Sequence, residues 1–205
     1  MAFFSFLRSM SSTSANAHKK IIVITAPSGS GKTTLVKRLL AASPKVTFSI
    51  SACTRKPREG EKDGVDYYFL DEADFRQKID EDAFVEWEMV YAGKYYGTLK
   101  TELERIWASG RYPLVDIDVM GALAVMNKYH DQCLTVFIQA PSIEILRQRL
   151  IGRGTETEQT LEERVKKADF ELGYAHQFQK VIVNDNLETA ASELQNLVDS
   201  FVGGI

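Results

Sequence analysis

The sequence predicts an α/β fold in which helices cover both faces of a parallel sheet. Runs of β-branched residues alternate with helical patterns along most of the chain. The first run is followed by a glycine-rich loop and then by a helical pattern. A segment from residue 51 to about residue 98 breaks this alternation with shorter strand-like pieces, which indicates an inserted subdomain of mixed α/β structure.

The predicted core strands are apolar runs bounded by turn residues. They cover residues 19–25, 45–51, 112–119, 133–140 and 180–185. Because these runs lack an apolar–polar alternation, we expect strands that are buried on both faces, as parallel strands are. Helical patterns are predicted over residues 32–42, 121–130, 142–151, 161–178 and 187–202.

The inserted segment reads differently from the core. Strand-like pieces over residues 65–70 and 84–90 flank a short helical pattern over residues 72–80. This pattern is interpreted as an inserted subdomain.

Composition indicates one soluble globular domain. The chain has 205 residues, of which 44% are hydrophobic and 26% charged. The two cysteines, Cys53 and Cys133, have neither a metal-binding spacing nor a disulfide framework. We expect reduced thiols and a cytoplasmic location.

Charge is distributed unevenly along the chain. The first 58 residues contain ten Lys or Arg and no Asp or Glu, although the whole chain has a net charge of −3. A segment without carboxylates suits a site that accepts several phosphates. We expect small anionic substrates and no nucleic-acid partner.

Residues 1–19 are interpreted as a disordered leader. The stretch "MAFFSFLRSMSSTSAN" is rich in serine, contains one arginine and is too short in apolar sequence to span a membrane. It loosely resembles an organellar transit peptide, and a start at Met10 is an alternative. No later stretch is long enough for a transmembrane helix, so no membrane partner is expected.

The stretch "ITAPSGSGKTTL", from Ile24 to Leu35, indicates a phosphate-binding loop, or P-loop. Such a loop presents backbone N–H groups to phosphates at the start of a helix. Its lysine, Lys32, is expected to reach the β- and γ-phosphates of a nucleotide, and the Thr33 hydroxyl to bind Mg²⁺. Such a loop serves ATPases, GTPases and many kinases, so it does not by itself identify the reaction. The first position holds Ala26 instead of the usual glycine, which an ordinary φ would permit. The predicted ATP-binding residues of the loop are Ala26, Pro27, Ser28, Gly29, Ser30, Gly31, Lys32, Thr33 and Thr34.

A second set of phosphate-binding side chains follows the loop in the sequence. Arg55 and Arg58 carry guanidinium groups suited to bidentate phosphate binding, and Tyr67 can add a hydroxyl donor. A surface loop with scattered charges is the alternative. Three such donors in one short segment favour a binding site for a phosphorylated acceptor.

At this point the sequence resembles the guanylate kinase family. The resemblance covers about residues 20–202 and is carried by motifs in the order and spacing of that family. Its most specific motif is "TRKPREGEKDGVDYYF", from Thr54 to Phe69. The other motifs are "APSGSGKTT", "FVEW", "YYGT", "LVDID", "GRGTET" and "VIVND".

The resemblance implies transfer of the γ-phosphoryl group of ATP to GMP, giving ADP and GDP, with dGMP as a second expected acceptor. Mg²⁺ is the implied cofactor. It also implies a domain over residues 20–202, with a core of about residues 20–50, 99–151 and 161–202, a GMP-binding subdomain over about 51–98, and a lid over about 152–160. Nothing in the sequence decides between a monomer and a homo-oligomer.

The resemblance further assigns site residues by their positions in the motifs. The GMP phosphate is expected to be held by Arg55, Arg58, Tyr67 and Tyr96, with Glu61 supporting the arginines. The base is expected to be read by Ser51, Glu86 and Thr98, with Asp118 beside it. Asp116 is expected to approach Mg²⁺ through water, together with Thr33. The predicted catalytic side chains are Lys32, Arg55, Arg149, Arg153 and Arg164, and Asn184 is expected to border the adenine. A charge on the helix surface is the alternative for Arg149, and a turn is the alternative for Asn184.

Guanine recognition by Glu86 also has a chemical basis. Guanine presents N1–H and an amine side by side, and one carboxylate can accept from both. Adenine would leave that carboxylate unpaired. Strand alternation alone permits the alternative that Glu86 faces water while Val85 and Trp87 point inward.

Two departures and two alternative functions accompany the resemblance. Ala26 replaces a glycine, and Met120 stands where the family usually has glutamine. A guanylate-kinase-like module that binds phosphorylated peptides without catalysis is one alternative. A kinase for another phosphorylated acceptor, such as a ribose bisphosphate, is the second.

Overall fold

The structure, a computed structural model, describes residues 19–152, 154 and 157–203. Its central sheet has five parallel strands in the order β2-β7-β1-β8-β9. The strands are β1 (Ile21–Thr25), β2 (Val46–Phe48), β7 (Tyr112–Asp116), β8 (Cys133–Gln139) and β9 (Lys180–Val183). The predicted parallel α/β fold is therefore confirmed.

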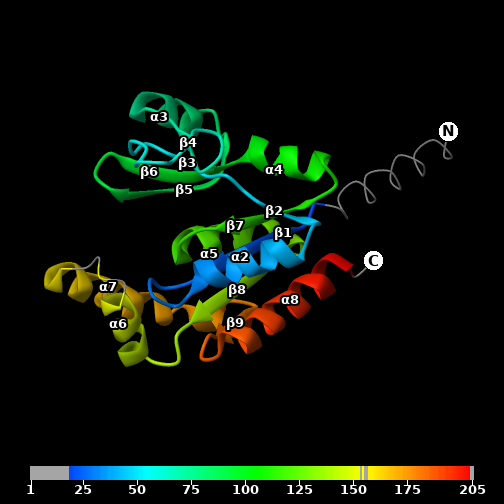
Figure 1. Cartoon of the computed structure of the whole chain (residues 1–205). Helices are drawn as coiled ribbons and strands as arrows, with labels where there is room; N and C mark the ends of the chain where they lie inside the picture. The colour runs from blue at the N-terminus through cyan, green and yellow to red at the C-terminus, as the bar shows by residue number, and fades with distance from the viewer. Residues whose placement is uncertain (1–18, 153, 155–156, 204–205) are drawn as a thin grey trace.

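Helices cover both faces of this sheet (Figure 1). Ile22 and Ile24 of β1 pack in a cluster with residues of α2 (Lys32–Ala42) and α8 (Leu187–Gly203). Ile21 and Val23 pack on the opposite face with residues of α4 (Lys100–Ala108) and α5 (Val119–Tyr129). Burial on both faces explains why the strand is a continuous apolar run.

A second sheet has four strands in the order β4-β3-β6-β5. They are β3 (Ala52–Cys53), β4 (Tyr68–Phe69), β5 (Phe84–Tyr91) and β6 (Lys94–Leu99), and α3 (Glu72–Asp80) belongs to the same segment. Phe75 of α3 stacks on Phe84 and Tyr95 with ring centroids 4.4 and 5.4 Å apart, so this sheet has an apolar cluster of its own. The division into core, GMP-binding subdomain and lid stays a prediction.

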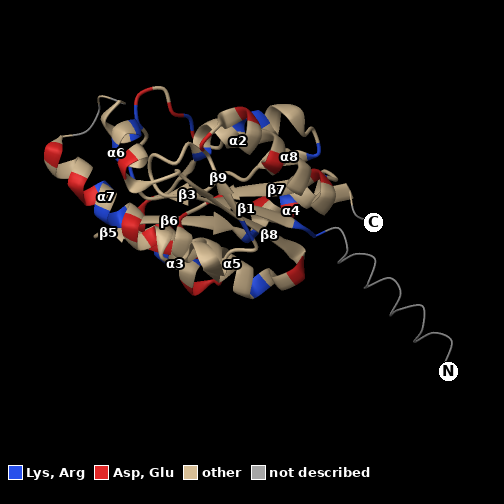
Figure 2. Ribbon diagram, turned by 90° about the horizontal axis from the view of Figure 1, so that it is seen from below, with Lys and Arg blue, Asp and Glu red and all other residues tan. Residues whose placement is uncertain are grey.

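Two further helices, α6 (Ile143–Ile151) and α7 (Glu158–Leu172), share a separate apolar cluster. Figure 1 shows them at the end of the central sheet, across from the second sheet. An ion pair between Arg147 and Glu162 also joins them. Charged residues of both signs follow one another along α7 (Figure 2).

The predicted bounds of α7 were wrong at both ends. The helix starts before residue 161 because Thr157 and Thr160 form a reciprocal capping box. It ends at Leu172, before Gly173, and a separate 3₁₀ turn, η2 (Ala175–Gln177), follows. A second 3₁₀ turn, η1 (His130–Gln132), follows α5.

The sequence prediction missed α4 and β6. Helix α4 begins at Lys100, and the preceding Leu99 provides no side-chain cap, so the usual start signal is absent. Its buried Leu103 and Ile106 have helical spacing, which was an available signal. No helix within the described residues is long and apolar enough to cross a membrane. The predicted leader, apart from Lys19, lies outside those residues.

Candidate active site

The P-loop lies between β1 and α2, as its sequence predicted. Gly29 and Gly31 have φ values of 93° and 88°, a region that strongly favours glycine. A Cβ on Gly31 would lie 2.3 Å from Nδ2 of Asn184, so any side chain there would also clash. The first turn of α2 contains no acidic residue, so its positive end is open to an anion.

Ala26 does not disturb this loop. It lies outside the positive-φ region, so an alanine causes no backbone strain there. Its methyl group packs against the apolar cluster that contains β1 and α2. The missing glycine is therefore compatible with a working loop.

Lys32 and Asp116 form an ion pair at the carboxyl end of the sheet. Neighbouring parallel strands bring the two together, because Asp116 ends β7 and the P-loop follows β1. The part of the chain that the structure describes has no cluster of three or more His, Cys, Asp or Glu arranged to hold a metal. The Thr33 hydroxyl and the Asp116 carboxylate still suit Mg²⁺, which typically takes one or two protein oxygens together with substrate phosphates.

A cavity of about 650 Å³ joins the P-loop to the second sheet and to α7. From the P-loop and β7 it is lined by Ala26, Pro27, Ser28, Lys32, Thr33 and Asp116. From the second sheet and the chain near it come Ser51, Tyr67, Glu86, Glu88, Val90 and Tyr96, and Asp118 also lines it. From α7 come Thr160, Glu163, Arg164, Lys167 and Glu171. One cavity therefore contains both the phosphate-binding loop and most of the predicted acceptor residues.

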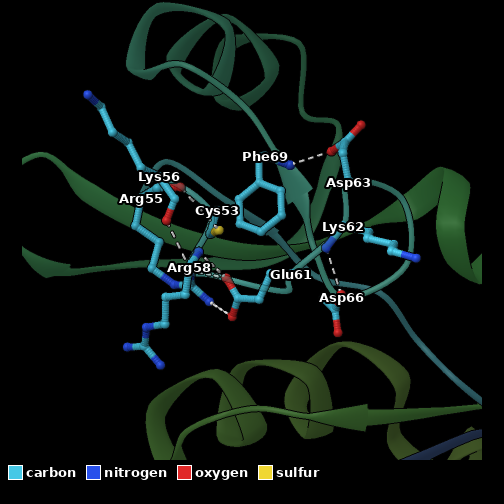
Figure 3. A network of polar contacts seen from close by, with 9 residues as sticks. All are labelled: Cys53, Arg55, Lys56, Arg58, Glu61, Lys62, Asp63, Asp66 and Phe69. Atoms are coloured by element: carbon cyan, nitrogen blue, oxygen red, sulfur yellow. Dashed lines mark hydrogen bonds and ion pairs between the residues drawn. The ribbon is translucent and has the colours of Figure 1, made fainter.

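Arg55 is held by Glu61 through two hydrogen bonds, which are drawn in Figure 3. Nη1 and Nη2 donate to the two carboxylate oxygens over 2.6 and 2.7 Å. These bonds, followed by one from the backbone N–H of Arg58, lower the pKa of Glu61 to about 2. Glu61 therefore stays ionised and fixes the guanidinium, as the predicted supporting role requires.

The remaining phosphate-site residues surround Arg55. Its guanidinium carbon lies 4.7 Å from the ring centroid of Tyr67, and the rings of Tyr67 and Tyr96 are 6.2 Å apart. Burial raises the pKa of Tyr67, so its hydroxyl remains protonated and can donate. The exposed side chain of Arg58 extends away from Glu61 in Figure 3.

Glu86 reaches the cavity because of an irregularity in β5. Phe84 pairs with Leu99 and Glu86 with Thr98, so two steps along β5 match one step along β6. Such a β-bulge places Glu86 on the face opposite Phe84, because Thr98 and Leu99 point to opposite faces. Val85 and Glu86 are both buried while Trp87 is 46% exposed, so the water-facing alternative for Glu86 is wrong.

Burial dominates the electrostatics of Glu86. Burial, together with the nearby charge of Asp118, raises the pKa of Glu86 to about 7, although the Thr98 hydroxyl opposes this shift. That hydroxyl donates to Oε1 over 2.6 Å. Because Thr98 is fully buried, this hydrogen bond holds the Glu86 carboxylate in one orientation. Asp118 caps α5 by accepting from the N–H of Gly121 over 2.8 Å.

The predicted arginines differ in their surroundings. Arg164 lines the cavity and donates to the Ser28 hydroxyl of the P-loop over 2.9 Å. Arg149 instead donates to the carbonyl of Asn184 over 2.9 Å. The Asn184 side chain donates to the carbonyl of Ser30 over 2.8 Å, so it supports the loop from behind. Arg153 lies outside the described residues.

Several cavity residues were missed by the sequence analysis. Glu88 follows Glu86 by two strand positions, a spacing that could have identified it. Lys167 and Glu171 lie on the same face of α7 as Arg164, at helical spacing. Glu171 is buried, which raises its pKa, although the charge of Lys167 opposes this effect. Met120, the second departure, lines a different cavity together with Trp87.

Comparison with known proteins identifies the family. Residues 18–201 match the family model for guanylate kinase. The guanylate kinase of Bacteroides fragilis is 46% identical over 184 residues, which cover 90% of each chain. That of Chlorobium chlorochromatii is 47% identical over 184 residues, covering 90% of this chain and 96% of the relative. The chain belongs to the guanylate kinase family.

A solved guanylate kinase agrees with this assignment. The crystal structure of guanylate kinase from Anaplasma phagocytophilum matches with a TM-score of 0.70 and 30% identity, covering 88% of this chain and 85% of that one. The family resemblance of the motifs is thereby confirmed. The roles of individual residues stay predictions.

Proposed function

We propose that this member of the guanylate kinase family transfers the γ-phosphoryl group of ATP to GMP, giving ADP and GDP. The observation that carries the proposal is the single cavity that contains both the P-loop and the residues around Glu86 and Tyr67. Donor and acceptor phosphates bound at these two places would face each other. Holding two reactants in that way removes much of the entropic barrier to their reaction.

The acceptor needs no general base. The attacking phosphate oxygen of GMP is already ionised near neutral pH, so positioning and charge neutralisation provide the catalysis. Lys32 and Arg164 both line the cavity and can neutralise charge on the transferred group. Arg55, held by Glu61, can bind the GMP phosphate. Arg149 and Arg153 remain proposed contributors.

Mg²⁺ is the proposed cofactor. When bound, it would supply positive charge that offsets the charge developing on the transferred phosphoryl group. Thr33 and Asp116 are the residues proposed to hold it, with Asp116 acting through water. Lys32 must then leave its ion pair with Asp116 and turn to the phosphates. A cytoplasmic location is proposed from the reduced thiols.

Guanine is the proposed base because Glu86 lies buried in the cavity. Its carboxylate would accept N1–H and the amine of guanine, and the hydroxyl of Ser51, which also lines the cavity, is proposed to bind the base as well. Thr98 is proposed to act mainly through Glu86, and Asp118 through its place beside that carboxylate. A buried polar group left unpaired by adenine would discriminate strongly against AMP.

A coupled ADP-release assay tests the proposal with GMP, dGMP, AMP and UMP as acceptors. We expect turnover with GMP, weaker turnover with dGMP and very little with AMP or UMP. Lys32→Ala should lower kcat by about a thousandfold or more, because it removes a charge from the transferred group. Thr189→Ala, an exposed substitution on α8, is the matched control. Near-normal turnover of folded Lys32→Ala would remove the P-loop lysine from the mechanism.

The non-catalytic alternative is not favoured. Phosphopeptide binding requires no P-loop lysine and no metal-binding hydroxyl, yet Lys32 and Thr33 both line the cavity. The comparisons with known proteins give this alternative no support. ATP-independent binding of phosphopeptides without any turnover of GMP would be the result that favours it.

A further inference from the structure

One carboxylate in the acceptor cavity has no use in the mechanism described above. Glu88 lines the cavity, and its Oε2 is buried. Among the residues that the structure describes, this oxygen has no hydrogen-bond partner. A buried acceptor without a donor costs free energy, so such a group calls for a ligand or another explanation.

The position of Glu88 in the sheet indicates which part of a substrate it meets. Glu88 lies two residues after Glu86, and both face the cavity. It pairs directly with Tyr96 on β6, whereas Glu86 pairs with Thr98. The Tyr96 ring in turn approaches Tyr67, over which Arg55 lies. Glu88 is therefore placed between the base-reading pair and the phosphate-binding group.

We propose that Glu88 is a specificity-determining residue that accepts hydrogen bonds from the ribose hydroxyls of GMP. This inference rests on the proposed function. In GMP the ribose lies between the base and the phosphate, and its 2′ and 3′ hydroxyls are neighbouring donors. A carboxylate can accept from both. A role for Glu88 at the phosphate is excluded by charge, because a carboxylate repels that group.

The inference predicts that the protein distinguishes GMP from dGMP. A hydrogen bond to a charged acceptor lost with the 2′ hydroxyl corresponds to roughly a tenfold weaker affinity, and the 3′ hydroxyl remains in both ligands. Glu88→Ala should weaken GMP more than dGMP and bring the ratio of their dissociation constants close to one. Glu88→Gln, which keeps one acceptor oxygen, should fall between.

The measurement is isothermal titration of GMP and dGMP without ATP, followed by KM values for both. Asp80→Ala is the control, because it removes an exposed carboxylate of the same segment outside the cavity. The control should keep the wild-type ratio. The titration measures binding alone, so its result does not depend on turnover. Failure of wild type to bind or phosphorylate GMP would instead contradict the proposed function.

Two outcomes would overturn the role of Glu88. The first is a wild type that phosphorylates GMP but binds GMP and dGMP equally. The second is a Glu88→Ala variant that weakens both ligands by the same factor.

Discussion

At the residue scale, Glu86 shows how burial prepares a side chain for recognition. Its carboxyl has a pKa of about 7 because the cavity removes it from water. Guanine can use only the ionised form, since both of its neighbouring N–H groups are donors. Binding of GMP should therefore expel a proton from Glu86 whenever the pH lies below that value.

The first prediction follows from this linkage. Below pH 7 the affinity for GMP should fall by up to about tenfold per pH unit, and proton release should accompany binding. Titration calorimetry in buffers of different ionisation enthalpy measures both quantities. The GMP phosphate also titrates near pH 6. Glu86→Gln is the control, because its proton release on GMP binding should come from the phosphate alone. An identical proton count in both proteins would contradict the assignment.

The same raised pKa predicts that the folded protein becomes more stable as the pH falls, whereas its affinity for GMP becomes weaker. The pKa of this carboxyl is higher in the folded protein than in the unfolded chain. Ionised Glu86 therefore lowers the free energy of unfolding at pH values above the folded-state pKa. This loss disappears as the pH falls from the folded-state pKa to the unfolded-state pKa. Glu86→Gln should therefore raise the free energy of unfolding at pH 8 and leave it nearly unchanged at pH 4.5. Chemical denaturation at both pH values tests this. Equal effects at the two values would show that Glu86 titrates normally.

Residue types indicated the P-loop and the phosphate-binding arginines, and the family resemblance added most of the other candidate site residues. Neither predicted how Glu86 reaches the cavity. The P-loop residues and Arg55 were identified because their chemistry is visible in the sequence. The bulge in β5 was not, because Phe84, Val85 and Glu86 read as an ordinary alternating strand. The base-reading role of Thr98 stays a prediction, and the sequence did not show that its hydroxyl donates to Glu86. Which acceptor a hydroxyl donates to depends on packing that the sequence does not display.

At the element scale, α4 connects the two sheets through Glu102. Glu102 is buried and accepts from the N–H of Ile50, the hydroxyl of Tyr68 and the guanidinium of Arg105. Burial opposes its ionisation, but the hydrogen bonds from Arg105, Ile50 and Tyr68 outweigh burial and lower its pKa. One carboxylate thus joins the chain after β2, the strand β4 and the helix that the sequence prediction missed.

Removing this carboxylate should destabilise the fold. Glu102→Ala would leave the N–H of Ile50 and the Tyr68 hydroxyl without their acceptor, at a cost of about 3 kcal/mol in the free energy of unfolding. Glu102→Gln should cost less, because its carbonyl can still accept. Glu104→Ala is the matched control on the same helix. It removes only an exposed ion pair with Lys19 and should cost under about 1 kcal/mol. Similar losses for Glu102 and Glu104 would contradict this role.

The elements differed in how well they could be predicted. β1 was predictable because Ile21, Ile22, Val23 and Ile24 are all fully buried, which leaves no polar position in the run. α4 was missed because Leu99 gives no cap and Glu102 occupies a buried position in its pattern. A buried carboxylate makes a helix look less amphipathic than it is. Its partners come from segments distant in sequence, so no local pattern reveals them.

At the scale of the whole molecule, the two sheets enclose a cavity that must hold two nucleotides and exclude water. Transfer to water would waste ATP, so the walls should move together once both substrates are bound. On the α7 side a contact already exists, since Arg164 donates to Ser28 of the P-loop. The larger movement is therefore expected of the second sheet, which carries Glu86 and Tyr96.

The chain enters and leaves the second sheet near Ser51 and Leu99, beside the carboxylate of Glu102 that binds Ile50. We expect the pivot there, because backbone positions at the ends of elements absorb such rotations.

With GMP and a non-hydrolysable ATP analogue together, small-angle scattering should give a smaller radius of gyration than with either ligand alone. Hydrogen exchange should slow in β5, β6 and α7, whereas β1 and β8 should exchange equally slowly in every state. Since Glu102 is buried and fully bonded, the rotation should keep its bonds intact, so Tyr68 and Ile50 should move little relative to α4. An unchanged radius, with equal protection of β5 and α7 with and without ligands, would contradict closure.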